Sequence, residues 1–169
     1  NSNFYIDDVT SIPKKRKPLP PFLTSTLQQE ANNRLYMGTQ QTMSVAQKLY
    51  ESGFITYMRT DGIDMAPEAV SATRNNIKEI YGNKYLPEKP RFYKNKIANA
   101  QEAHECIRPT DIGKNAETLN LQDINQRKLY ELIRNRTLAS QMGDEISETT
   151  TVIIKDETKG NSLKAVGRV

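Results

Sequence analysis

The sequence predicts a mainly helical α+β fold in which a helical domain is flanked by strands of an incomplete β domain. Apolar residues recur at helical spacing between residues 24 and 142, and strand-like runs lie near both ends, at 3–9, 149–155 and 163–169. With 36% hydrophobic and 26% charged residues, the chain of 169 residues can bury a core of ordinary domain size. We divide it into a flanking strand (1–12), a basic proline-rich linker (13–21), a helical domain (22–142) and return strands (143–169).

Both ends of the chain are predicted to belong to one β layer. The first strand leads into Pro13-Lys14-Lys15-Arg16-Lys17-Pro18-Leu19-Pro20-Pro21, whose prolines disfavour both a helix and a central strand. We therefore expect an exposed linker there. The last two strands are joined by a turn-rich connection at 156–161, which favours a hairpin. Because these strands form only part of a layer, we expect the chain to be a central piece of a larger protein.

The first two helices are predicted on either side of a short break. The first begins at Thr24–Thr26, where Ser25-x-x-Gln28 or Thr26-x-x-Gln29 can form a capping box. The second runs from about 41 to 52 and ends at Gly53, which suits a left-handed helix cap. Its predicted inner face consists of Met43, Ala46, Leu49 and Tyr50. Two helices followed by an extended segment resemble a helix-turn-helix unit.

Three further helices are predicted downstream. Pro67 suits the first position of one helix and Gly82 ends it, and another runs from about 121 to 142. Between them, a short helix carries His104. At helical spacing its polar face holds Gln101, His104, Glu105 and Arg108, and its apolar face holds Ala103, Cys106 and Ile107. By pattern alone, His104 is a structural surface residue and Cys106 a packing residue.

The segment Gly53-Phe54-Ile55-Thr56-Tyr57-Met58-Arg59-Thr60-Asp61 places a tyrosine two positions before an arginine. If it is extended, Tyr57 and Arg59 emerge on the same side, about 7 Å apart. A phenol can attack a phosphodiester, and a guanidinium can hold the phosphate oxygens. For an arbitrary Tyr-x-Arg, a strand with one buried face explains the pattern equally well.

Three strings in this chain resemble motifs of the type IA DNA topoisomerases, and the bacterial enzymes most closely. They are Ile55-Thr56-Tyr57-Met58-Arg59-Thr60-Asp61, the upstream string Pro21–Ala31 and the downstream string Ala100–Thr110. They occur in the family's order and at about its spacing, and the resemblance covers residues 20–142. Two positions depart from the family pattern: Gly62, where serine is common, and Cys106, where alanine is usual.

The resemblance implies a role for each candidate residue. Tyr57 is the nucleophile that forms a 5′-phosphotyrosine, Arg59 supplies positive charge, and His104 assists at the scissile phosphate by hydrogen bonding or by proton exchange. Residues expected to support the site or to bind DNA are Thr60, Asp61, Glu102 and Arg108. Of these, Thr60 and Asp61 are expected to fix the turn after the nucleophile, and Arg108 to form an ion pair with Glu105 or Glu102.

The resemblance also implies an activity, a cofactor and partners. The parent enzyme would relax negative supercoils without ATP by cutting one strand, passing the other and resealing. DNA, preferably single-stranded or negatively supercoiled, would be its partner together with the remaining domains of the enzyme. Mg²⁺ would bind at an acidic Asp-x-Asp site outside this chain, which contains no such string, so the fragment alone should be inactive.

Two alternatives use similar residues. Tyrosine recombinases and type IB enzymes also act through Tyr, Arg and His, but their tyrosine follows a His-x-x-Arg motif, whereas Tyr57 precedes His104 and the spacing here is His-x-x-x-Arg. A non-catalytic helix-turn-helix module would instead bind duplex DNA independently of Tyr57.

Composition limits which cellular compartment and which binding partners we expect for this chain. The formal net charge of +4 is weakly in favour of a polyanionic partner, and the sole cysteine excludes an internal disulfide. With no signal peptide and no apolar run of membrane-spanning length, we expect a cytoplasmic protein without a membrane partner. The resemblance to the bacterial enzymes further implies a bacterial, nucleoid-associated protein.

Overall fold

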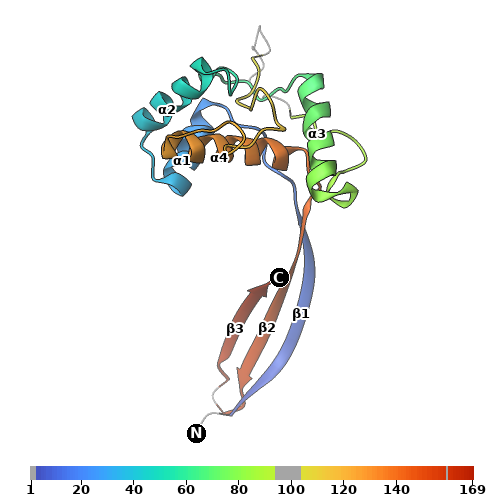
Figure 1. Cartoon of the computed structure of the whole chain (residues 1–169). Helices are drawn as coiled ribbons and strands as arrows, with labels where there is room; N and C mark the ends of the chain where they lie inside the picture. The colour runs from blue at the N-terminus through green and yellow to red at the C-terminus, as the bar shows by residue number, and fades with distance from the viewer. Residues whose placement is uncertain (1–2, 94–103, 159) are drawn as a thin grey trace. The chain divides into compact units, whose positions relative to one another are not determined.

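The computed structural model describes residues 3–93, 104–158 and 160–169, and it combines helices and strands as the sequence predicted (Figure 1). The chain divides into two compact units, one made of residues 1–17 with 144–169 and the other of residues 18–143.

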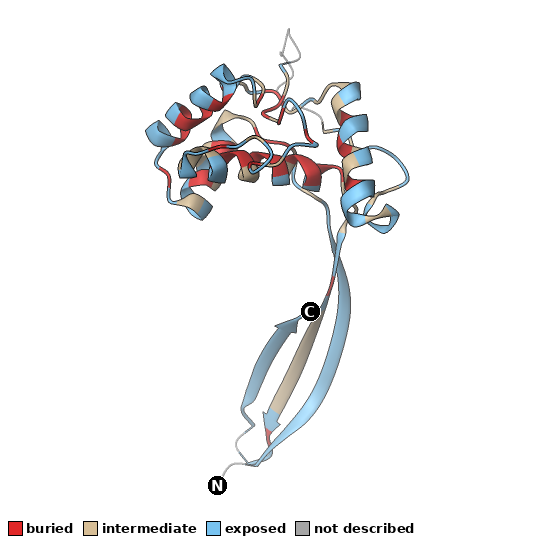
Figure 2. Cartoon of the chain, in the orientation of Figure 1, coloured by how far each residue is buried: buried red, intermediate tan, exposed pale blue. Residues whose placement is uncertain are grey.

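The first unit is an antiparallel sheet in the order β1 (Phe4–Arg16), β2 (Glu145–Asp156), β3 (Ser162–Arg168), so β2 lies between its two partners (Figure 1). The predicted linker was wrong for residues 13–16, because β1 continues through them and Pro13 pairs with Glu148. Within this sheet β1 is an edge strand, where a proline does not need to donate a ladder hydrogen bond. All of β1 is solvent-exposed (Figure 2).

The second unit contains the helices. They are α1 (Thr24–Leu35), α2 (Thr39–Glu51), α3 (Pro67–Tyr81), the short 3₁₀-helix η1 (Asn83–Tyr85) and α4 (Ile124–Ser140). The predicted start of α3 at Pro67 is confirmed, and Gly82 follows it with φ of 93°, a conformation that glycine adopts without strain. The predicted capping box of α1 was wrong: the Thr26 hydroxyl accepts a hydrogen bond from the Leu23 N–H at 3.1 Å.

Local signals also fix the end of α2 and the start of α4. Gly53 has φ of 74° and donates its N–H to the carbonyl of Tyr50 at 2.8 Å, which turns the chain out of α2 as predicted. The carboxylate of Asp123 accepts the N–H groups of Gln126 and Asn125. These two bonds lower the pKa of Asp123, because they favour its charged form.

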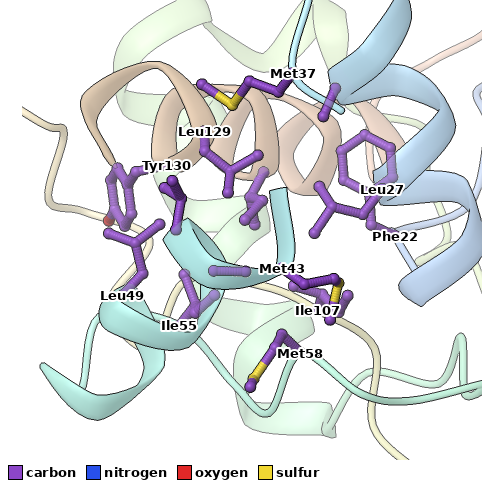
Figure 3. Packing of buried hydrophobic residues seen from close by; sticks show 14 of the residues in the cluster. Phe22, Leu27, Met37, Met43, Leu49, Ile55, Met58, Ile107, Leu129 and Tyr130 are labelled. Atoms are coloured by element: carbon purple, nitrogen blue, oxygen red, sulfur yellow. The ribbon is translucent and has the colours of Figure 1, made fainter. Parts of the chain in front are cut away.

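The core of this unit lies between α1, α2 and α4 and includes residues from the loops (Figure 3). Leu27 comes from α1, Leu49 from α2 and Leu129 from α4, and all are fully buried. The loops contribute Phe22, Ile55, Met58 and Ile107. The Tyr57 segment and the string after His104 therefore both contribute residues to the core.

The predicted short helix at His104 was wrong over the described residues 104–110, which are extended. Single bridges pair Glu105 with Asp64, Ile107 with Phe22 and Pro109 with Ile55. The N–H of Ile107 donates to the carbonyl of Phe22 at 2.7 Å, so it is unavailable for a helix. Among the described residues of this string, Cys106 and Ile107 are buried and His104 is exposed, as helical spacing grouped them, but the backbone bonds are made with distant segments.

The helix-turn-helix interpretation stays a prediction; the structure has two consecutive helices, α1 and α2, joined by residues 36–38. Over the described ranges, the chain has no helix with the length and apolar content needed to span a membrane.

Candidate active-site segment

Tyr57 lies on an exposed bend between two residues that anchor it. Ile55 and Met58 are buried in the core, whereas Tyr57 is 49% exposed and Arg59 is also exposed. The predicted extended alternation was wrong here, since Ile55 would then share the face of Tyr57. The segment is irregular. Its bends let the backbone present Tyr57 and Arg59 to solvent while Ile55 and Met58 stay buried in the core.

One side of this segment is fixed by the extended string after His104. The N–H of Thr56 donates to the carbonyl of Arg108 at 2.9 Å, and the Thr56 hydroxyl donates to the carbonyl of Cys106 at 2.7 Å. The N–H of Thr110 donates a hydrogen bond to the carbonyl of Phe54 at 3.0 Å. These bonds hold the backbone on both sides of residue 55, directly before the tyrosine.

The other side is fixed by Thr24 at the start of α1. Its hydroxyl donates to the carbonyl of Met58 at 2.8 Å and accepts the N–H of Thr60 at 2.8 Å, while its own N–H donates to the carbonyl of Thr60 at 3.0 Å. The backbone around Arg59 is therefore held by a helix terminus. Helix signals alone predicted for Thr24 only a place at a helix start, although it lies within the upstream string Pro21–Ala31.

His104 and Asp61 meet beside Arg59. The Nδ1 of His104 lies 3.2 Å from the Oδ1 of Asp61, and both side chains are more than half exposed. The Thr60 hydroxyl accepts the N–H of Gly62 at 3.0 Å, which supports the predicted turn, and donates to the carbonyl of Glu105 at 3.0 Å. Thr60 therefore fixes the turn, whereas the Asp61 carboxylate contacts the histidine.

An open pocket of about 510 Å³ joins these groups. Its lining residues are Leu23, Thr24, Ser25, Gln28, Arg59, Thr60, Asp61 and His104. The N-terminal end of α1, which carries partial positive charge, thus borders the same space as a guanidinium and an imidazole. Such a set suits an anionic group such as a phosphodiester.

Tyr57 is outside the lining of this pocket. Its ring packs edge-on against Tyr50, with centroids 5.2 Å apart and an interplanar angle of 64°. Helical spacing predicted Tyr50 on the inner face of its helix, but Tyr50 is 42% exposed. Helical spacing could not reveal this contact, because it is made across the turn at Gly53.

The remaining candidates have structural partners. Arg108 pairs with Glu105, with Nε 2.7 Å from Oε1, and the same carboxylate oxygen accepts the N–H of Ala66 at 3.2 Å. The predicted ion pair of Arg108 is thus present. Glu102, the other predicted partner, lies outside the described residues.

Cys106 is fully buried, in agreement with a packing role. Burial raises the pKa of its thiol to about 12, so the thiolate is absent near neutral pH.

The described residues do not fit a divalent-cation site. Across 3–93, 104–158 and 160–169, no three His, Cys, Asp or Glu side chains gather where they could hold a metal ion.

Comparison with known proteins identifies the relatives of this chain. A family profile described as DNA topoisomerase matches residues 1–169. The chain is 47% identical to DNA topoisomerase 1 of Zymomonas mobilis over 169 residues, which is 100% of the chain and 14% of that protein. It is 51% identical to DNA topoisomerase 1 of Streptomyces coelicolor over 156 residues, covering 91% of the chain and 16% of that protein.

A solved structure gives the same result. Full-length topoisomerase I from Thermotoga maritima superimposes with a TM-score of 0.78 at 36% identity, covering 98% of this chain and 27% of that one. The chain thus spans between about a seventh and about a quarter of the length of these relatives. It belongs to the DNA topoisomerase family, and within that family it resembles bacterial topoisomerase I.

Proposed function

We propose that this chain is the central, tyrosine-bearing part of an ATP-independent type IA topoisomerase that relaxes negatively supercoiled DNA. The observation that carries the proposal is the hydrogen-bonded frame around residues 54–62. It holds Tyr57 outward on a bend, and Arg59, Asp61 and His104 border one pocket directly after it.

Tyr57 is the nucleophile in this proposal. Its phenolic oxygen loses its proton and forms a bond to the scissile phosphorus. The bond from phosphorus to the 3′ oxygen breaks, and that oxygen takes up a proton and leaves as a 3′-hydroxyl, so no net proton is gained or lost. The products are a 5′-phosphotyrosine and a free 3′ end. Because one phosphoester replaces another, the reverse reaction reseals the strand without ATP.

Arg59 and His104 act on the phosphate. The guanidinium can hold two phosphate oxygens at once, and it opposes the negative charge that develops during attack. The imidazole either donates a hydrogen bond to a phosphate oxygen or exchanges a proton with the reacting groups. Since Tyr57 lies outside the pocket lining, the scissile phosphate must sit between its hydroxyl and these side chains.

The DNA must be locally single-stranded for one strand to reach this bend. While that strand is cut, the protein parts and the other strand passes through, which changes the linking number one step at a time. Mg²⁺ would be held by acidic residues elsewhere in the enzyme, and the remaining domains would complete the gate.

Substituting Tyr57→Phe in the full-length enzyme tests the proposal, because this change removes one hydroxyl and keeps the ring. We expect loss of relaxation and of covalent adduct, with single-stranded DNA affinity within a few-fold of wild type. The measurement uses end-labelled single strands quenched in detergent, followed by gel electrophoresis. Tyr36→Phe is the matched control, since Tyr36 is 90% exposed and is absent from the pocket lining.

The position of the label separates the alternatives. A protein-linked 5′ end of the cut strand supports this assignment, whereas a linked 3′ end would indicate type IB or recombinase chemistry. Duplex binding with no adduct from the wild-type enzyme would favour the non-catalytic helix-turn-helix module. Adduct in the Tyr57→Phe enzyme would make another tyrosine the nucleophile.

A further inference from the structure

The tyrosine of the active-site segment is one half of an aromatic pair. Tyr50, in the last turn of α2, and Tyr57 make the T-shaped contact described above, which is a favoured geometry for two rings. Within the described residues, the Tyr57 side chain makes no hydrogen bond. The ring of Tyr50 is therefore the neighbour that favours a particular direction of the phenol.

The backbone between the two rings is held by specific bonds. The carbonyl of Tyr50 accepts the N–H of Gly53, and the carbonyl of Leu49 accepts the N–H of Phe54 at 2.9 Å. Leu49 and Ile55 are both buried in the core. The α-carbons that carry the two rings are thus attached to rigid supports, and the remaining freedom of Tyr57 is rotation of its side chain.

We propose that Tyr50 is a positioning residue that orients the Tyr57 ring for attack; this rests on the proposed function. A half-exposed tyrosine samples several side-chain rotamers in water. Only rotamers that bring the phenolic oxygen in line with the phosphorus are productive. A ring contact of the usual strength that favours the productive rotamer raises the cleavage rate by about two- to tenfold.

Orientation can be distinguished from direct DNA contact. The exposed ring of Tyr50 could instead stack on a base of the bound strand, which would raise affinity. An orienting residue changes the rate of adduct formation at saturating DNA and leaves binding nearly unchanged. Rate and affinity therefore have to be measured separately.

The experiment uses the full-length enzyme with Tyr50→Phe and Tyr50→Ala. Single-turnover adduct formation is measured at saturating single-stranded oligonucleotide, and affinity is measured by anisotropy in the Tyr57→Phe background, where the ring remains but no bond is cut. Tyr81→Ala is the matched control: Tyr81 is also 42% exposed, lies in the last turn of α3 and forms a T-shaped pair with Tyr85.

We expect Tyr50→Ala to slow adduct formation about two- to tenfold with affinity within twofold, and Tyr50→Phe and Tyr81→Ala to match wild type. If Tyr50→Ala fails to fold, Tyr50→Leu keeps an apolar side chain without a ring and should show the same slowing. Any of three results would overturn the proposal. The ring-free variant could form the adduct at the wild-type rate, or Tyr50→Phe could be slowed as much as Tyr50→Ala. Alternatively, Tyr50→Ala could lose DNA affinity while its rate of adduct formation at saturating DNA stays unchanged. Failure of the proposed function would give a different result: the wild-type enzyme would form no covalent adduct, or the Tyr57→Phe enzyme would still form one.

Discussion

A β-carbon on Gly62 would lie 1.6 Å from the carbonyl oxygen of His104 and 2.3 Å from its carbonyl carbon. Atoms that are not bonded do not approach so closely, so no other residue fits at position 62 without moving one of the two segments. The approach belongs to the same contact in which the Thr60 hydroxyl donates to the carbonyl of Glu105. The absence of a side chain at position 62 thus allows the backbone of His104 to lie against the turn after Tyr57.

We predict that Gly62→Ser lowers the free energy of unfolding of this chain by about 1–3 kcal/mol, because the side chain overpacks the contact. Urea denaturation measures the change. Gly38→Ser is the matched control: a β-carbon there meets nothing within 4 Å, and Gly38 caps α2, a position at which serine is favourable. Equal stability of the two variants would show that the segments separate at no cost.

A second prediction concerns His104 and its carboxylate partner. His104→Ala in the full-length enzyme should slow cleavage by about an order of magnitude or more while leaving the melting temperature nearly unchanged, because the side chain is exposed. Asp61→Asn keeps a polar partner at the same place and removes the charge, so it should slow cleavage less. Rapid-quench adduct formation and thermal melting give the two readouts. A lower melting temperature with normal cleavage would instead assign His104 a structural role.

Local sequence signals predicted the elements that depend on local physics. Pro67, Gly82 and Gly53 set helix boundaries through backbone geometry alone, and the structure has helix boundaries at all three. The extended string after His104 could not be predicted in this way. Its backbone pairs with Phe22, Ile55 and Asp64, which are between about 40 and 85 residues away in sequence.

The same distinction holds within the candidate site. The motif at 55–61 pointed to a candidate segment because the two groups on which it depends, Tyr57 and Arg59, lie close together in the sequence. The segment is also contacted by Thr24, through hydrogen bonds, and by Tyr50, through its ring. These contacts depend on how α1 and α2 pack around the segment, and residue spacing in the sequence does not predict that packing. Pro13 was misjudged for a related reason, since its tolerance in β1 depends on which strand lies at the sheet edge.

A third prediction uses the buried thiol. Burial raises the pKa of Cys106 to about 12 from an ordinary value of 9.0, so the unfolded chain loses this proton at lower pH than the folded chain. The protonated Cys106 thiol therefore makes its full contribution to the free energy of unfolding below about pH 9, and this contribution should diminish as pH rises toward 12. Urea unfolding at pH 8, 9 and 10 should show this decline, and Cys106→Ala should reduce it.

Burial also raises the pKa of Tyr130 to about 12, so part of the decline should persist in Cys106→Ala. A thiol reagent at pH 8 should react with the chain only when it unfolds. Rapid labelling of the folded chain would contradict the burial of Cys106.

The last prediction concerns the 169-residue chain by itself. The unit at 18–143 buries a continuous core between α1, α2 and α4, so we expect the chain to fold and to bind single-stranded DNA weakly. Its affinity should fall steeply as salt rises, because phosphate contacts release bound counterions. Anisotropy titrations at several salt concentrations test this, with a duplex of the same length as the comparison.

With Mg²⁺ added, the isolated chain should form no covalent adduct, because its described residues contain no acidic cluster able to hold the ion beside Tyr57. The assay mixes the chain with end-labelled single strands and Mg²⁺, quenches in detergent and looks for label that migrates with the protein. The full-length enzyme serves as the positive control. Robust labelling of the isolated chain would mean that Tyr57, Arg59 and His104 suffice for strand cleavage, and that the acidic residues we assign to another part of the enzyme are dispensable.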